Sequence, residues 1–406
     1  MRILQQIKDI PFKQKYATIL LIAMSIQLVA IEGLTISPVK VGIMAITLVV
    51  FIFYVPYISK AVWGACIYWL LCYFTASFHE EMRFSTLGYL GMFLITYIVF
   101  YNLIYTGVFT LLQFKKILKF LLLAYCVTLL LQQTCIILGF RDIPFLNLIG
   151  TQYYAWNRLP TLSCEPSHTA RIISAVMLGY IQCLEIQRGK KISLFQLFDK
   201  DNRLVTLAYL WLVFTMGSAT GWIGFGILSL YFVRLRTIFY IIPIFIGMFF
   251  ILQFSGNKQF IRVKTAIGTT LTGDVLKIFK TEASGSVRII PLLNTLTNTD
   301  LTQKESWVGS GTYSADRESR HEWRNLSRKL GIVEQYGLLG LLGSLFLLYF
   351  CAIYRFFSIE TLYFIILLLC SLGNEYFTWS MVMVFTAMRY FKEQKENECL
   401  DYHSKL

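Results

Sequence analysis

Apolar runs of similar length, separated by short polar links, make up nearly the whole of this 406-residue chain. Most runs hold roughly 17–22 residues, the length that an α-helix needs to cross the hydrocarbon core of a bilayer. The runs begin near Tyr16, Val39, Ala61, Leu87, Leu118, Pro166, Leu204, Ile238, Leu330, Thr361 and Tyr376. This pattern predicts an all-α, polytopic membrane protein that forms a single integral membrane domain over residues 1–406.

The run at residues 204–233 is too long for one comfortable span and is interrupted by Gly217-Ser218-Ala219-Thr220-Gly221. Glycine and hydroxyl residues of this kind interrupt a helical pattern. We therefore interpret the run as two short spans, seven and eight, that meet at this tip. With this pair counted, the chain has about twelve transmembrane helices.

The basic links predict the orientation, because Lys and Arg in short links favour the cytoplasmic side. With twelve spans, every basic link falls on the same side of the membrane. These links carry Lys13, Lys60, Lys115, Lys116, Lys119, Arg188, Lys190, Arg234, Arg355 and Lys392. A single span at residues 204–233 would place Arg234 on the opposite side of the membrane from the other basic links. The side on which the basic links lie therefore favours two spans in this run. Both termini are then cytoplasmic, with a charged tail at residues 389–406.

Two longer polar segments are predicted to face outward, at residues 139–164 and 255–329. The second is a large periplasmic loop between spans nine and ten, and it contains more basic than acidic residues. Long loops are exempt from the charge bias of short links. The excess is therefore either ordinary solvated charge or a site for an anionic ligand such as a phosphate.

The composition agrees with a membrane protein, since 56% of the residues are hydrophobic and 15% are charged. Many of the basic residues behind the net charge of +14 lie in the short links between spans. Because no nucleic-acid-binding module is present either, we expect no nucleic acid partner. The nine cysteines are scattered and form no C-x-x-C pair, which argues against a zinc or redox motif. Asp199-Lys200-Asp201 and His79-Glu80-Glu81 are isolated acidic motifs, and we predict no metal and no cofactor.

A polar cluster marks the start of the sixth span. Glu165 comes directly before Pro166, and proline favours the first position of a helix. Glu165, His168 and Arg171 then recur at helical spacing, roughly on one face. Glu165 and His168 would act as a general base or orient a hydroxyl, or else would be a helix-start carboxylate and an interfacial histidine. Arg171, nearly two turns into a span, needs an acid or a substrate phosphate as partner.

A second polar group surrounds the large loop. Arg288 precedes a segment in which Gly309 and Gly311 would let the backbone approach a ligand. Further polar residues follow near the outer end of span ten: Arg320, His321, Arg324 and Glu334. The forked guanidinium of arginine suits a pyrophosphate. Solvated loop charge is the alternative interpretation for each of them.

These motifs, in this order and topology, resemble the O-antigen polymerase/ligase superfamily, particularly the Wzy-type polysaccharide polymerases of bacteria. The resemblance covers roughly residues 158–340. It rests on Arg158 followed by Glu165-Pro166-Ser167-His168-x-Ala170, on the loop with Arg288 and Gly309-Ser310-Gly311, and on Glu334-x-Tyr336-Gly337-Leu338-x-Gly340.

The chain also departs from that family in two places. Many members have Ser-Arg-Thr-Gly in span seven, where this chain has Ser218-Ala219-Thr220-Gly221 and so lacks the arginine. The ligases have a His-Asn pair shortly before span ten. Here His321 lies further upstream and is followed by Glu322, which disfavours the ligase reading.

The resemblance implies a glycosyltransferase reaction on the outer face of the bacterial inner (cytoplasmic) membrane. A growing chain on undecaprenyl pyrophosphate is the donor, and a hydroxyl of a new lipid-linked repeat unit attacks its anomeric carbon. Lipid pyrophosphate leaves, and the product is a lipopolysaccharide O-antigen, a capsule or an exopolysaccharide. The expected partners are undecaprenyl-pyrophosphate-linked oligosaccharides, membrane lipid, a chain-length regulator and a flippase.

The same resemblance implies roles for the polar residues. Glu165 or His168 would orient or deprotonate the acceptor, while Arg158, Arg171 and Arg288 would hold the pyrophosphate. The remaining residues would line the site: Gly309, Gly311, Arg320, His321, Arg324 and Glu334. One alternative is an O-antigen ligase that transfers polymer to the lipid A core. The non-enzyme alternative is a lipid-linked oligosaccharide flippase or transporter, which predicts two related halves that the sequence does not show.

Overall fold

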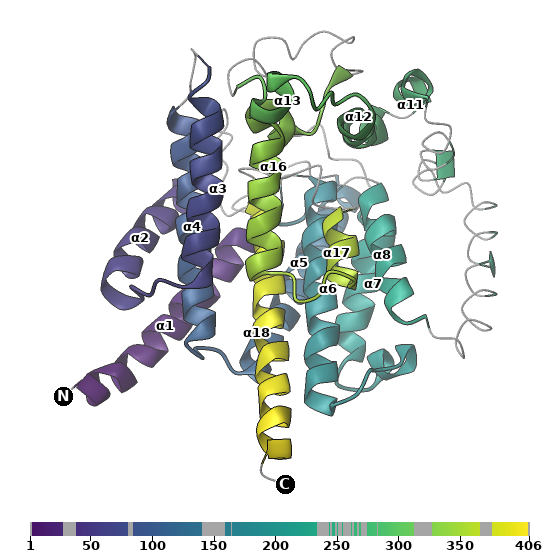
Figure 1. The fold of residues 1–406 in the computed structure, drawn as a ribbon. Coiled ribbons are helices and arrows are strands. Elements are labelled where there is room, and N and C mark those ends of the chain that lie inside the picture. Colours follow the sequence, from purple (N-terminus) through teal and green to yellow (C-terminus); the bar gives the residue numbers. More distant parts are fainter. Residues whose placement is uncertain are drawn as a thin grey trace.

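The computed structural model describes most of the chain, and the regular elements in that part are helices. The described residues are 2–26, 38–79, 84–139, 159–163, 165–233, 274–281, 283–311, 327–365 and 376–404, with single positions between 243 and 268. Over these residues the chain forms helices, turns and loops and no strand (Figure 1). The predicted all-α class is therefore confirmed for the described residues.

Among the described residues, four helices are long and apolar enough to cross a membrane, which indicates a membrane protein. They are α4 (Phe84–Tyr105), α5 (Leu111–Ile137), α6 (Pro166–Arg188) and α16 (Gly331–Cys351). Shorter apolar helices accompany them: α2 (Pro38–Tyr54), α7 (Arg203–Thr215) and α8 (Ala219–Tyr231). Most of the predicted ninth span and parts of the predicted loop at residues 255–329, chiefly 255–273 and 312–326, lie outside the described residues.

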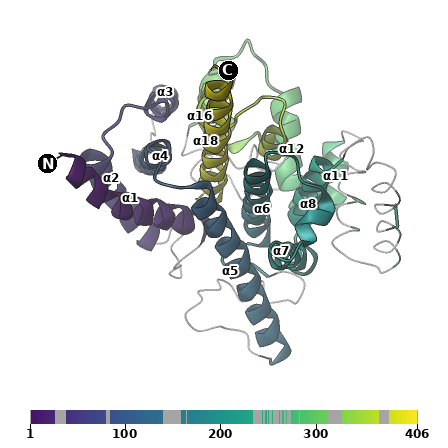
Figure 2. The ribbon, with the colours of Figure 1, turned by 90° about the horizontal axis from the view of Figure 1, so that it is seen from below.

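The remaining elements complete the bundle and its ends. They are α1 (Arg2–Ser25), α3 (Lys60–Ala76), η2 (Leu194–Phe198), α11 (Val275–Thr281), α12 (Ala283–Thr297), α13 (Lys304–Val308), α17 (Ile359–Tyr363) and α18 (Tyr376–Ser404). Seen from below, α16 and α18 lie between α1–α4 on one side and α6–α8 on the other (Figure 2).

The predicted break in the run at residues 204–233 is present. The helix α7 ends at Thr215 and α8 begins at Ala219. The two helices pack through aromatic rings, with the centroid of Phe214 at 4.9 Å from that of Trp222 and 5.7 Å from that of Phe225. The chain therefore reverses at the Gly/Ser/Thr tip as the sequence predicts.

Three helices extend beyond the predicted spans. The first helix begins at Arg2, well before the predicted start at Tyr16. The lysines 115, 116 and 119 lie inside α5 and not in a link, because a capping box formed by Thr110 and Gln113 starts that helix early. The predicted tail is helical, since α18 continues to Ser404 and is supported by the ion pair Arg389–Glu393 at 2.8 Å, four residues apart.

Most of the basic residues predicted to share one side lie at one end of the bundle, which we call the basic end. Each of four contacts ties one basic residue to a helix end there: Lys115 Nζ to Gln187 Oε1 (2.7 Å), Lys395 Nζ to Ile186 O (3.1 Å), Arg355 to Glu396 (3.0 Å), and Lys60 Nζ to the ring centroid of Phe350 (6.0 Å). The helices α6 and α16 both end there, so their first residues lie at the opposite end, which we call the site end.

Small residues let the central helices approach closely. A Cβ added at Gly64 of α3 would lie 2.9 Å from the Leu347 side chain of α16, and one at Gly343 would lie 3.3 Å from Tyr68 Cα. In the same way, a Cβ at Gly179 of α6 would lie 2.9 Å from Val384 of α18. Small residues at helix contacts are typical of membrane bundles, where van der Waals packing holds helices together.

Candidate polar site at the start of α6

The sixth helix begins where the sequence predicts, at Pro166. Glu165 is its N-cap residue, with an extended backbone (φ −141°, ψ 151°). The Glu165 carboxylate does not cap the helix, and its Oε2 accepts a hydrogen bond from the Ser167 hydroxyl at 3.0 Å. The residue is half-buried at the site end.

His168 and Arg171 follow in the first and second turns of α6. His168 is half-buried, and Arg171 is only 4% exposed. A guanidinium this deeply buried keeps its charge, because arginine is not deprotonated in proteins. The predicted helix start and spacing therefore place a carboxylate, an imidazole and a buried cation within two turns. Their roles in catalysis stay predictions.

The segment before α6 holds a strained residue. Thr161 has φ 56°, in the left-handed region that β-branched residues rarely adopt. Its N–H donates to Gln132 Oε1 at 3.1 Å, and Gln132 Nε2 donates to its carbonyl at 3.4 Å. Its hydroxyl is 2.8 Å from that of Thr169. Such strain costs about 1–3 kcal/mol and persists only where the surroundings enforce it, often at functional sites.

The end of α7 closes the other side of this segment. Leu159 N–H donates to the carbonyl of Met216 at 3.1 Å. In the last turns of α7, the Thr215 hydroxyl accepts a hydrogen bond from the side-chain amide of Gln133 in α5 at 2.9 Å, and the Trp211 indole N–H donates to the same amide at 3.1 Å. The ends of α5 and α7 therefore hold the entry to α6 through polar contacts.

These supporting residues were missed by sequence reasoning. Gln132 and Gln133 are buried in the apolar helix α5, and Thr161 and Thr169 are buried as well. The available signal was a pair of adjacent glutamines inside an apolar run, since polar groups within a span need partners. Their partners were not readable from the pattern, because that of Gln132 lies 29 residues further along the chain and those of Gln133 lie 78 and 82 residues further.

The tip between α7 and α8 lies against α6. A Cβ added at Gly221 would lie 3.7 Å from Ala170 Cβ and 3.2 Å from Met216 Cε. Ser218 and Thr220 are both 5% exposed. The segment Ser218-Ala219-Thr220-Gly221 is therefore adjacent to the turn of α6 that carries Arg171.

The second predicted group is also at the site end, where α13 packs on α16 (Figure 1). Ser310 N–H donates to the carbonyl of Glu334 at 2.7 Å. Gly309 (φ 77°) and Gly337 (φ 67°) face each other: a Cβ at Gly309 would lie 2.6 Å from Gly337 N, and one at Gly337 only 2.1 Å from Trp307 O. Two backbone segments meet here because neither residue has a side chain.

The space beside the predicted glycines is thus occupied by the protein itself. Gly311 lies against His79, where a Cβ would be 3.0 Å from the ring carbon Cγ. The His79 ring is in turn 3.4 Å from the carbonyl of Val308. These contacts dock α13 between α3 and α16. Whether Gly309 and Gly311 also approach a ligand stays a prediction.

Glu334 is in the first turn of α16, where a carboxylate is stabilised by the helix dipole. Its Oε2 is 3.3 Å from Arg328 Nε, and the Arg328 side chain is 46% exposed. The other predicted residues fall outside the described part of the chain: Arg158, Arg320, His321 and Arg324. Arg288 is within α12, but its side chain is also outside that part.

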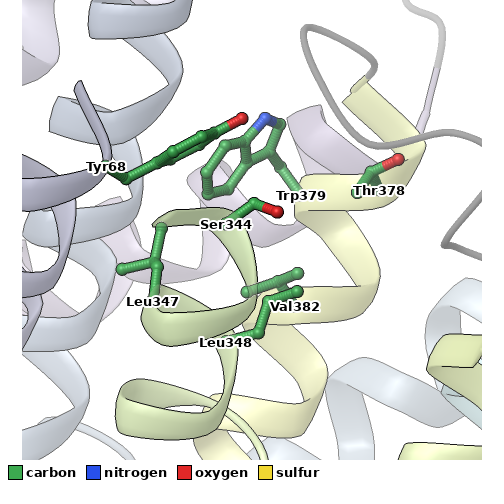
Figure 3. A pocket seen from close by; sticks show the side chains of 7 residues that line it. All are labelled: Tyr68, Ser344, Leu347, Leu348, Thr378, Trp379 and Val382. Atoms are coloured by element: carbon green, nitrogen blue, oxygen red, sulfur yellow. The ribbon is translucent and has the colours of Figure 1, made fainter. Parts of the chain in front are cut away.

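A separate cavity lies between α3, α16 and α18. It is partly open and is lined by Tyr68, Ser344, Leu347, Leu348, Thr378, Trp379 and Val382 (Figure 3). Its lining is mainly hydrocarbon, and the polar atoms of Tyr68 and Trp379 lie near each other at one side. The space in it that water-sized molecules can reach is about 20 Å³, room for about one water. It is therefore not the candidate site.

The described residues contain no group of three or more His, Cys, Asp or Glu side chains that could hold a metal ion. Asp199 of the Asp-x-Asp motif forms an ion pair with Arg188 at 3.0 Å, at the basic end and far along α6 from Glu165. Comparison of the chain with protein-family models, curated proteins and solved structures finds no match. A functional assignment therefore depends on the chemistry of the site itself.

Proposed function

We propose that this protein is a polysaccharide polymerase of the bacterial inner membrane. It would join undecaprenyl-pyrophosphate-linked oligosaccharide repeat units at the membrane face on which α6 begins. The observation that carries the proposal is the placement of Glu165, His168 and the buried Arg171 in the cap and first two turns of α6. A carboxylate, an imidazole and a desolvated cation at one helix start suit transfer of a sugar from an anionic leaving group.

The contacts at the basic end support the proposed orientation. Lys60, Lys115, Arg188, Arg355 and Lys395 are brought together there, and clustered basic links favour the cytoplasmic side. The site end would then face the periplasm, where lipid-linked repeat units are joined. Both termini would lie in the cytoplasm, in a topology of about twelve spans.

The reaction balances without a cofactor. A hydroxyl oxygen of the acceptor repeat unit forms a bond to the anomeric carbon of the donor chain, and the bond from that carbon to the pyrophosphate oxygen breaks. The hydroxyl proton passes to Glu165 or His168 and then to water. The growing negative charge on the leaving pyrophosphate is stabilised by Arg171 and by the positive end of the α6 dipole.

The burial of Arg171 strengthens its interaction with the leaving pyrophosphate. A charge in a water-excluded site interacts with a phosphate much more strongly than it would in water. The strained Thr161 and the amide of Gln132 hold the chain that enters α6, so the Glu165 carboxylate is presented in one position. Arg158, Arg288, Arg320, His321 and Arg324 are proposed as further contacts to pyrophosphate and sugar.

The proposal is tested by deletion of the gene and complementation with variants. We expect deletion to leave single repeat units, and the wild-type chain to restore long polymer. Glu165→Gln, at equal expression, is expected to lower polymer output by about 100-fold. The matched control is Glu305→Gln, an exposed carboxylate at the same end, which is expected to behave as wild type.

Other outcomes would assign another function. Long polymer that is made but not attached to the lipid A core would indicate a ligase. Repeat units that never reach the periplasmic face would indicate a flippase. Full activity of Glu165→Gln would show that this carboxylate has no role in the reaction.

A further inference from the structure

The link between α6 and α7, residues 189–202, presents apolar side chains outward at the basic end. Phe195 in η2 is 85% exposed, and Leu194 and Phe198 are each 42% exposed. In the same short helix only Leu197 is buried, at 3% exposure. An apolar patch of this kind, bordered by polar residues, marks a surface that contacts a membrane or a partner.

The protein holds this link rigidly. Ser193 and Gln196 form a capping box around η2. The Thr206 hydroxyl of α7 donates to the carbonyl of Leu197 at 2.7 Å, and Asn202 Nδ2 donates to that of Gln196 at 3.2 Å. Asn202 is itself fixed by the hydroxyl of Tyr180 in α6 at 2.9 Å. The exposure of Phe195 is therefore built into the fold.

The border of the patch is basic. Residues 188–203 contain five basic and two acidic residues. Lys190, Lys191, Lys200 and Arg203 are exposed, whereas Asp199 is neutralised by its ion pair with Arg188 at 3.0 Å. The surface around Phe195 therefore carries positive charge that suits an anionic partner.

The neighbouring helix extends the apolar surface. Leu204, Leu207 and Trp211 of α7 are 59%, 49% and 43% exposed and recur at helical spacing. Such a stripe on an apolar helix faces lipid. The link thus lies where the exposed apolar stripe of α7 begins.

We propose that residues 189–203 form a membrane anchor for anionic phospholipid. Leu194, Phe195 and Phe198 insert at the boundary between headgroups and acyl chains, and Lys190, Lys191 and Lys200 hold the anionic headgroups. Aromatic side chains flanked by lysines bind an anionic bilayer surface in this way. The anchor fixes the basic ends of α6 and α7 at one depth, and it is independent of the reaction proposed above.

The insertion is tested on the full chain in lipid nanodiscs with a tryptophan at position 195. Phe195→Trp adds fluorescence to the eight native tryptophans, and the wild-type signal is subtracted. Phospholipids brominated near the headgroup are expected to quench the added signal, and more strongly with phosphatidylglycerol than with phosphatidylcholine. The matched control is Leu301→Trp, at an exposed position of the site end, which is expected to remain unquenched.

The headgroup contacts are tested by native mass spectrometry of the purified protein with added phosphatidylglycerol. Lys190→Gln, Lys191→Gln and Lys200→Gln together are expected to reduce bound phosphatidylglycerol about twofold or more. Lys277→Gln, Lys280→Gln and Lys304→Gln, three exposed lysines of the site end, are the matched control and are expected to retain it.

Two results would overturn the proposal. An added signal at position 195 that no brominated lipid quenches would show that the patch lies in water or against another protein. Equal phosphatidylglycerol binding by both triple variants would show that these lysines hold no headgroups. Because the two measurements use different variants, misfolding of one leaves the other decisive.

Discussion

The side-chain amide of Gln132 hydrogen-bonds both backbone groups of Thr161, accepting from its N–H at 3.1 Å and donating to its carbonyl at 3.4 Å. Gln132 is fully buried, and Thr161 is in the left-handed region. Gln132→Ala leaves both backbone groups of Thr161 without this partner. We expect the free energy of unfolding to fall by about 1–3 kcal/mol, measured by denaturation of the purified protein in detergent.

The control for this prediction is Gln187→Ala. Gln187 is exposed, and its hydrogen bond with Lys115 is open to water, so its loss is expected to change stability by less than about 0.5 kcal/mol. If Gln132→Ala were as stable as Gln187→Ala, the amide would not be what holds Thr161.

Gly337→Ala is expected to separate α13 from α16. A Cβ at this position would lie 2.1 Å from Trp307 O, and the backbone has φ 67°. We expect a loss of about 3 kcal/mol or more, together with faster proteolysis near Lys304. Gly331→Ala has open space beside it and is the matched control, expected to be neutral or slightly stabilising.

A buried ion pair at the basic end provides a further prediction. Glu360 is 4% exposed, and its carboxylate is 2.5 Å from Lys392 Nζ and 2.7 Å from Gln182 Nε2. Lys392→Met leaves the carboxylate buried without its cation, and we expect a loss of about 3–5 kcal/mol. Glu396→Gln breaks the exposed pair with Arg355, where about 0–1 kcal/mol is expected. Equal losses in the two variants would contradict this distinction.

The same pair predicts acid sensitivity. Burial raises the pKa of Glu360, but the charge and hydrogen bond of Lys392 and the hydrogen bond of Gln182 outweigh it and lower the pKa below 4.5. A carboxylate with a lowered pKa in the folded state stabilises the protein above its ordinary pKa. That contribution is lost as the pH falls through the lowered value. Unfolding measured from about pH 7 to about pH 3 should therefore show a smaller pH dependence in Glu360→Gln than in the wild type.

Arg171 is expected to be the most sensitive position for activity. If it holds the leaving pyrophosphate, Arg171→Lys keeps the charge but loses the forked geometry, and polymer output should fall about 100-fold. The measurement is the length distribution of polymer in cells with equal protein levels. Arg203→Lys, at an exposed arginine of the basic end, is the control. Normal polymer in Arg171→Lys would limit the residue to a structural role.

The sequence by itself determined the helical class, the start of α6 and the reversal between α7 and α8. Each depends on local physics: apolar runs of span length, the fixed backbone of Pro166, and the Gly/Ser/Thr tip. The spacing that places Glu165, His168 and Arg171 together is also local. Where a cap or an ion pair extends a helix, the helix continues beyond the predicted span, as at Thr110 in α5 and Arg389 in α18.

Only the tertiary structure decided which distant segments meet. Gln132 reaches Thr161 across 29 residues, and Gly309 meets Gly337 backbone to backbone. No local window contains both members of such a pair, because the contact exists only after the helices have packed. The sequence indicated that the glycines allow a close approach. The fold decided that the chain itself occupies that space, since two backbones come together only where neither bears a side chain.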